Sequence, residues 1–209
     1  KVFFGESESR AEVAYDNLGK IDPSFYSDQK SWEITASDDG SSGIGNAFDG
    51  NEKTFWHTAS HVLAQAVKRL YPNAKLAIGP AIDSGFYYDF DVEKPFTAEE
   101  LRKIEAEMKK IVKENAELEQ FTLSPDEAIS FLKEQDEPYK VELCEEHAGK
   151  GEPISFYRQG EFTDLCAGPH LMKTGVIKAF KLLSCTGAYW RGSEKNKMLS
   201  RVYAIAFPK

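Results

Sequence analysis

Histidine and cysteine are rare in this chain of 209 residues, and four of the seven lie in two short pairs. His57 and His61 are four residues apart at the start of a helical pattern, so both imidazoles project from one helix face. Cys166 and His170 enclose Cys-Ala-Gly-Pro-His, in which Gly168-Pro169 predicts a turn that brings the thiol and imidazole to one side. Three imidazoles and one thiol make a complete tetrahedral zinc set; alternatively, they hold a water for general base catalysis.

Each pair alone is weak evidence, because such spacings often reflect chance or pairing on a helix surface. Together the two pairs use three of the four histidines, which favours a single site. The fourth, His147, lies in a polar Glu-Glu-His run, and we expect it to be exposed and without a functional role. Three cysteines are too few for a disulfide framework, and they indicate a reducing compartment.

The elements that must position these residues follow from apolar periodicity. Helices are predicted from His57 to Tyr71, from Thr97 with Glu100 completing a capping box, and from Ser124 with Pro125 in the first turn. Strands are predicted at 75–78, 85–90, 139–143, 154–157, 176–183, 188–190 and 201–207. This order predicts an α+β fold, with a mostly antiparallel sheet packed against helices and a short irregular or β segment ahead of it.

Charge is unevenly distributed along an acidic chain of net charge −8. Residues 1–56 carry 5 basic and 11 acidic side chains, whereas residues 165–209 carry 8 basic side chains and one acid, Glu194. The basic segment is either an ordinary solvated sheet face or a surface that faces phosphate. No apolar run approaches the roughly 18 residues of a membrane span, so we expect no membrane partner.

Six runs of residues occur in the order found in one protein family. They include HTASHVLAQAVK (57–68), AIGPAIDSGFYYDF (77–90), FTDLCAGPH (162–170) and GAYWRGSEKNKMLSRVY (187–203), with the shorter PYKV (138–141) and FKLL (180–183). Residues 57–209 thereby resemble the editing domain of bacterial threonyl-tRNA synthetases, which is shared with alanyl-tRNA synthetases. The GFYYD and AYWRG runs are more similar to the threonyl branch.

The resemblance implies a cytoplasmic deacylase that hydrolyses seryl-tRNA at the acceptor end, with no bound nucleotide cofactor and no aminoacylation core in this chain. A threonine pocket cannot exclude the smaller serine, because one methyl group is worth only about 1–3 kcal/mol, so a second hydrolytic site is needed. The family's catalytic positions fall on His57, His61, Lys140, Asp164, Cys166 and His170, and its substrate-binding positions on Gly79 and Tyr88. In the threonyl branch no metal is expected, whereas the equivalent four residues bind zinc in the alanyl branch.

Residues 1–56 do not resemble the small domain that ordinarily precedes this editing domain. Residues 34–58 instead resemble the opening of a discoidin-like carbohydrate-binding module, which suggests a chimera of residues 1–56 with an editing domain at 57–209. The alternatives to the leading interpretation are therefore a zinc-dependent hydrolase of the alanyl type, a carbohydrate-binding fragment, and an inactive chimera in which Trp56 and the acidic segment crowd His57.

Overall fold

The computed structural model describes residues 2–6, 9–13, 52–149 and 153–207, and chain contacts divide the protein into Lys1–Ile44 and Gly45–Lys209. In the first unit, β1 (Val2–Glu6) pairs antiparallel with β2 (Ser9–Val13), within the segment for which the sequence predicts short irregular or β structure. Most of the discoidin-like segment lies outside the described residues. The division also falls earlier than the expected boundary between residues 56 and 57.

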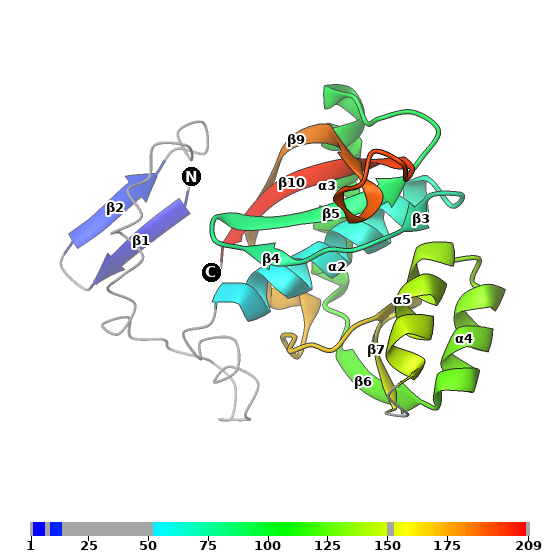
Figure 1. The fold of residues 1–209 in the computed structure, drawn as a ribbon. Helices are drawn as coiled ribbons and strands as arrows, with labels where there is room; N and C mark the ends of the chain where they lie inside the picture. Colours follow the sequence, from blue (N-terminus) through cyan, green and yellow to red (C-terminus); the bar gives the residue numbers. More distant parts are fainter. Residues whose placement is uncertain (1, 7–8, 14–51, 150–152, 208–209) are drawn as a thin grey trace. The chain divides into compact units, whose positions relative to one another are not determined.

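The second unit contains a five-stranded antiparallel sheet in the order β3-β5-β10-β9, with β4 also paired to β5 (Figure 1). Its strands are β3 (Lys75–Leu76), β4 (Ala81–Ile82), β5 (Gly85–Asp91), β9 (Ala179–Tyr189) and β10 (Met198–Phe207). A second antiparallel sheet has the order β6-β7-β8, from β6 (Leu118–Leu123), β7 (Ile154–Gln159) and β8 (Phe162–Leu165). The α+β prediction is thus confirmed.

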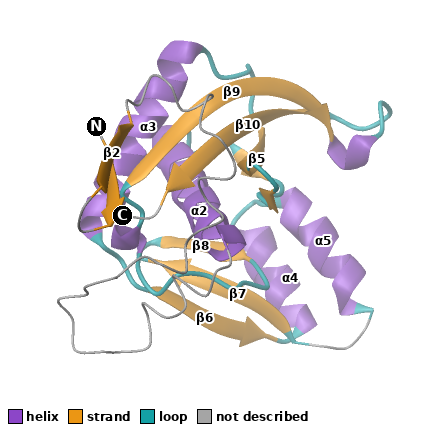
Figure 2. Ribbon diagram, turned by 90° about the vertical axis from the view of Figure 1, so that its left-hand side faces the viewer, coloured by secondary structure: helices purple, strands orange, loops and turns teal. Residues whose placement is uncertain are grey.

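Helix α2 (Glu52–Leu70) lies between the two sheets (Figure 2). Its apolar side chains pack with Phe86 and Phe90 of β5, with Phe162 of β8 and with the inner face of α3 (Ala98–Glu114) to form the main core. Because α2 is covered on several sides, polar residues such as Thr58 and His61 are buried along it. The helix that carries His57 and His61 therefore runs through the centre of this unit.

A smaller core joins the second sheet to α4 (Pro125–Glu134) and α5 (Pro138–Ala148). The capping box predicted at Thr97 and the helix start predicted at Ser124 are confirmed, and Ser124 also forms a capping box with Glu127. The strand predicted at 139–143 is wrong, because these residues belong to α5. Tyr139, Val141 and Leu143 mimic strand alternation, but the helix buries Lys140 and Cys144, which are four residues apart.

Helix α2 begins at Glu52, five residues before the predicted start. Phe55 and Trp56 are buried in the main core, and the Trp56 indole donates a hydrogen bond to the Ala206 carbonyl at 2.9 Å. Trp56 is therefore a core residue, which removes the reason for expecting it to crowd His57. Sequence periodicity also missed β6 and β8, which are short strands with several polar residues.

The basic C-terminal segment is largely neutralised by acidic residues that precede it in the chain. Five of its basic side chains make ion pairs: Lys173 with Glu117, Lys181 with Glu105, Arg191 with Glu142 and Glu146, Lys197 with Asp91, and Arg201 with Asp89. Among the described residues only Lys178 and Lys195 of this segment make no ion pair. This pattern favours the solvated-face interpretation over a phosphate-facing surface. Within the part of the chain that is described, no helix is long and apolar enough to span a bilayer.

Candidate functional site

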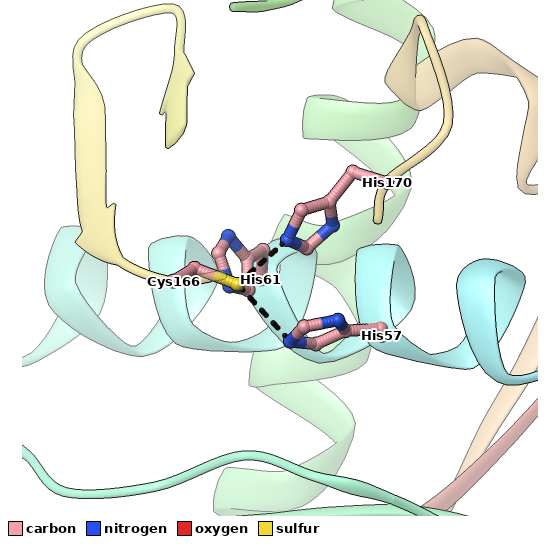
Figure 3. A group of neighbouring side chains, drawn as sticks. All are labelled: His57, His61, Cys166 and His170. Carbon is pink, nitrogen blue, oxygen red and sulfur yellow. Dashed lines mark hydrogen bonds between the residues drawn. The ribbon is translucent and has the colours of Figure 1, made fainter. Parts of the chain in front are cut away.

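His57, His61, Cys166 and His170 converge on one point beside α2, although two lie more than 100 residues away from the others in sequence (Figure 3). One donor atom from each lies within 4.8 Å of all the others. The Cys166 Sγ atom is 3.2 Å from His57 Nε2 and 3.0 Å from His170 Nε2. The structure thus brings the two sequence pairs together, as their residue types predicted.

The cysteine is presented by a loop that follows β8. The Cys166 backbone N–H donates to the Ser155 carbonyl of β7, and the Ser155 hydroxyl donates to the Cys166 carbonyl. Gly168 then turns the chain with φ of 75°, a conformation in which a Cβ atom would collide with the Tyr157 hydroxyl. Because its N–H donates to Cys166 Sγ at 3.3 Å, this glycine also helps to orient the sulfur.

Burial keeps all three clustered imidazoles neutral near pH 7. The pKa of His57 is lowered by burial, while the Asp164 carboxylate and the Pro169 carbonyl oppose part of that shift. The pKa of His61 is lowered further by burial and by the nearby His57 and Lys140. Burial also lowers the pKa of His170, with added effects from His61 and His57. His57 alone of the three is only half-buried, so it is the imidazole that a substrate or water can reach.

Cys166 is a neutral thiol in the absence of a metal. Burial raises its pKa to about 12, and the Asp164 carboxylate adds to that effect while the Gly168 N–H and Lys140 oppose it. A neutral thiol is a poor nucleophile and a weak hydrogen-bond donor. The chemistry of proton transfer therefore falls to the imidazoles, unless a cation displaces the thiol proton.

A buried carboxylate, Asp164 of β8, connects His61 of the cluster to two further groups, Lys140 and Tyr88. Its Oδ1 atom lies 2.7 Å from Lys140 Nζ, and its Oδ2 atom accepts a hydrogen bond from the Tyr88 hydroxyl at 2.7 Å. His61 Nε2 is 3.6 Å from the same Oδ2 atom. Burial and the adjacent Asp164 raise the pKa of Tyr88, so its hydroxyl remains a donor. Every residue assigned to catalysis by resemblance is thus within this cluster or its immediate surroundings.

Gly79 has an evident packing role. A Cβ atom at this position would overlap the Tyr88 ring, so only glycine lets that ring lie against the backbone. The Gly79 carbonyl also accepts a hydrogen bond from the Ser60 hydroxyl of α2 at 2.9 Å. Direct contact of Gly79 with substrate stays a prediction. His147 is exposed at the end of α5, as expected for a residue outside the site.

A cavity of about 210 Å³ adjoins the cluster at Asp164 and Lys140. Its other polar lining includes Gln65, Lys68 and Glu137, and none of the four clustered His and Cys residues lines it. Glu137 is anchored there by Lys68 Nζ and the Leu76 N–H, each at 2.7 Å. Since Glu137 directly precedes α5, these contacts fix the start of the helix that carries Lys140. Sequence reasoning missed this anchor, whose only signal was an acid before a proline.

The donor set fits a zinc ion. Tetrahedral zinc takes imidazole and thiolate ligands, and the other ring nitrogen of a ligating histidine commonly bonds to a carboxylate. His61 has one nitrogen facing Asp164, while its Nδ1 atom is buried with no hydrogen-bond partner among the described residues. A buried nitrogen without a partner, on a residue of this donor set, fits a cation site and equally a site for a bound water.

In a comparison with known protein families, residues 154–203 match the model described as the threonyl and alanyl tRNA synthetase second additional domain. Over 158 residues, the chain is 68% identical to the threonine–tRNA ligase of Caldanaerobacter subterraneus subsp. tengcongensis. The matched segment covers 76% of this chain and 24% of that relative. For the threonine–tRNA ligase of Acetivibrio thermocellus the identity is 65% over 161 residues, which are 77% of this chain and 25% of the relative. For the threonine–tRNA ligase of Clostridium tetani the identity is 67% over 164 residues, which are 78% of this chain and 26% of the relative.

The chain spans about a quarter of the length of the curated relatives that it matches. It therefore contains a threonyl-tRNA synthetase-like segment that includes the second additional domain. Residues 57–209 number 153, so matches of 158 and 164 residues include positions before His57. This agrees with the earlier start of α2. These comparisons support neither the discoidin-like resemblance of residues 34–58 nor a chimera.

Proposed function

We propose that this chain is an editing deacylase that hydrolyses the ester of seryl-tRNA formed in error by a threonine–tRNA ligase. The observation that carries the proposal is the convergence of His57, His61, Cys166 and His170 around the buried Lys140–Asp164 pair. The similarity to threonine–tRNA ligases supplies the substrate class. On this proposal the partner is the acceptor end of tRNA, and the protein works in the cytoplasm.

The reaction needs a base for water, a group that orients the ester and a donor for the developing oxyanion. His57 suits the base, because it is neutral near pH 7 and half-buried rather than enclosed. Asp164 suits the seryl ammonium: a carboxylate has about four acceptor positions, and the strong bonds from Tyr88 and Lys140 use two of them. Lys140 then supplies positive charge beside the ester.

The direct test is deacylation of seryl-tRNA and threonyl-tRNA by the full 209-residue chain, with His57→Ala as the matched control. We expect faster loss of serine than of threonine, and loss of that difference in the variant. Equal hydrolysis of both substrates above the buffer rate, or activity that survives in His57→Ala, would contradict the proposal.

A zinc-dependent hydrolase is the second candidate, favoured by the unpartnered His61 Nδ1 atom and the complete donor set. His57, His61, Cys166 and His170 would hold the ion, which would supply Lewis acidity to a bound water or carbonyl. Metal analysis of protein purified without chelator, compared with Cys166→Ala, distinguishes the two candidates. Stoichiometric zinc that is lost with the thiol supports the second candidate, and metal-free active protein supports the first.

A further inference from the structure

Thr58 lies in α2 next to His57 and is fully buried. Its hydroxyl oxygen contacts three groups: the Thr54 carbonyl at 3.0 Å, the Leu171 backbone N–H at 2.9 Å and His170 Nδ1 at 3.1 Å. The same hydroxyl thus touches both the ring of His170 and the backbone directly after it. No other contact described for His170 offers Nδ1 a hydrogen-bond partner, since Tyr157, His57 and His61 meet it as neighbouring rings.

Donor and acceptor counting decides which way these bonds run. A threonine hydroxyl has one hydrogen and two lone pairs. The Thr54 carbonyl can only accept, so the hydroxyl hydrogen points to it; the Leu171 N–H can only donate, so it occupies one lone pair. The remaining lone pair faces His170 Nδ1, which must therefore carry the hydrogen. The reverse arrangement would leave two acceptors, the Thr54 carbonyl and the Thr58 oxygen, 3.0 Å apart with no hydrogen between them.

We propose that Thr58 is a positioning residue that holds His170 in the Nδ1-protonated tautomer, with the Nε2 lone pair directed at Cys166 Sγ. Nε2 lies 3.0 Å from that sulfur, so it accepts the thiol hydrogen and cannot donate one. A neutral ring has only one N–H, and the hydrogen bond on one nitrogen decides which role the other plays. The catalytic consequence rests on the proposed deacylase, whereas the tautomer itself does not.

This assignment gives His170 a role different from that of His57. His170 is an acceptor fixed from behind, which serves equally to orient the Cys166 thiol or to ligate a cation through Nε2. His57, on the other side of the sulfur and only half-buried, is the imidazole that water can reach. Thr58 thereby separates the duties of two imidazoles that touch the same thiol.

Nitrogen-15 NMR of the histidine rings tests the tautomer in the metal-free full chain. With only four histidines, ¹⁵N-histidine labelling gives few signals, and His170→Gln identifies the one that disappears. We expect protonated Nδ1 and bare Nε2 in the wild type and in Thr58→Ser, and a mixed or reversed tautomer in Thr58→Val. A wild-type ring protonated at Nε2 would overturn the proposal without any variant, as would a Thr58→Val ring that keeps the wild-type tautomer.

Thr54→Val is the matched control, because it makes the same change one turn earlier on α2. The Thr54 hydroxyl is buried with no hydrogen-bond partner among the described residues, so its loss should leave the His170 signals unchanged. In the deacylation assay Thr58→Val should be about 10–100-fold slower, the range seen when the hydrogen-bond partner that orients a ligating histidine is removed, while Thr58→Ser and Thr54→Val stay within about threefold. Wild-type deacylation that is absent would refute the proposed function, while the NMR result still decides the tautomer. Full activity in a folded Thr58→Val would overturn the positioning role.

Discussion

Lys140 Nζ and Asp164 Oδ1 lie 2.7 Å apart, and the two side chains are only 5% and 3% exposed. The lysine comes from the first turn of α5 and the aspartate from β8, so this ion pair joins the helical layer to the second sheet. Because the pair is nearly dry, each charge depends on the other, and Asp164 also depends on the Tyr88 hydroxyl. The proposed function and the stability of the protein therefore depend on the same ion pair.

Lys140→Met should reduce both stability and deacylation. Leaving Asp164 buried without its cation costs about 3–5 kcal/mol, and losing the positive charge beside the ester slows hydrolysis at least about tenfold. Adding Asp164→Asn should restore much of the stability but none of the activity. Thermal melts and single-turnover deacylation measure the two effects. Lys133→Met, which removes an exposed lysine with a loose 3.8 Å ion pair to Glu145, is the control and should change neither.

Activity should fall on the acid side of the profile, below pH 6.5. Burial lowers the pKa of His57 below its ordinary value of 6.5, so more than half of the imidazole is neutral at pH 6.5. The single-turnover rate should therefore decline as pH falls, with the midpoint of the decline below pH 6.5. A decline centred above pH 6.5 would mean that His57 is not the controlling base.

Stability should decline over the same acid range. His57, His61 and His170 all have lowered pKa values in the folded protein, so below about pH 6.5 the unfolded chain binds more protons than the folded one. The contribution of the three neutral imidazoles to the free energy of unfolding is thus fully present above that pH and is lost as pH falls below it. Melting temperatures of wild type and His61→Gln measured from pH 7.5 to 5 test this, since the variant should show a shallower decline.

Truncation should show where the stable unit begins. Removing residues 1–44 should leave the melting transition of Gly45–Lys209 nearly unchanged, because the chain divides there. Removing residues 1–56 also deletes the buried Phe55 and Trp56 and should cost several kcal/mol, since loss of one large aromatic side chain alone costs about 3–5. Trp56→Phe, which mainly removes the bond to Ala206, should cost far less. Equal melting of both truncations would instead support the predicted boundary at residue 57.

Cys166→Ala should lower deacylation less than His57→Ala, and chelator treatment should have no effect, if the reaction is metal-independent. The reason is that the thiol is neutral, with a pKa of about 12, and acts only as a weak hydrogen-bonding partner of two imidazoles. Activity and metal content before and after dialysis against chelator provide the measurement. Activity that vanishes with the chelator and returns with zinc would support the zinc candidate instead.

Local sequence determined the parts of this protein that depend on neighbouring residues. The capping boxes at Thr97 and Ser124 and the shared face of His57 and His61 follow from contacts within one or two helical turns. The pairing of His57 and His61 with Cys166 and His170 was also foreseeable, because their ligand chemistry is complementary.

Tertiary structure decided what depends on packing between distant segments. Lys140 lies on a helix rather than the predicted strand, because Glu137 is anchored by Lys68 and Leu76 and the buried positions follow a helical spacing. Burial among distant segments lowers the pKa values of the three histidines, two on α2 and His170 in the loop after β8. The basic C-terminal segment is largely neutralised by acids from earlier elements. Such effects require knowing which surfaces meet, and no periodicity within a single segment carries that information.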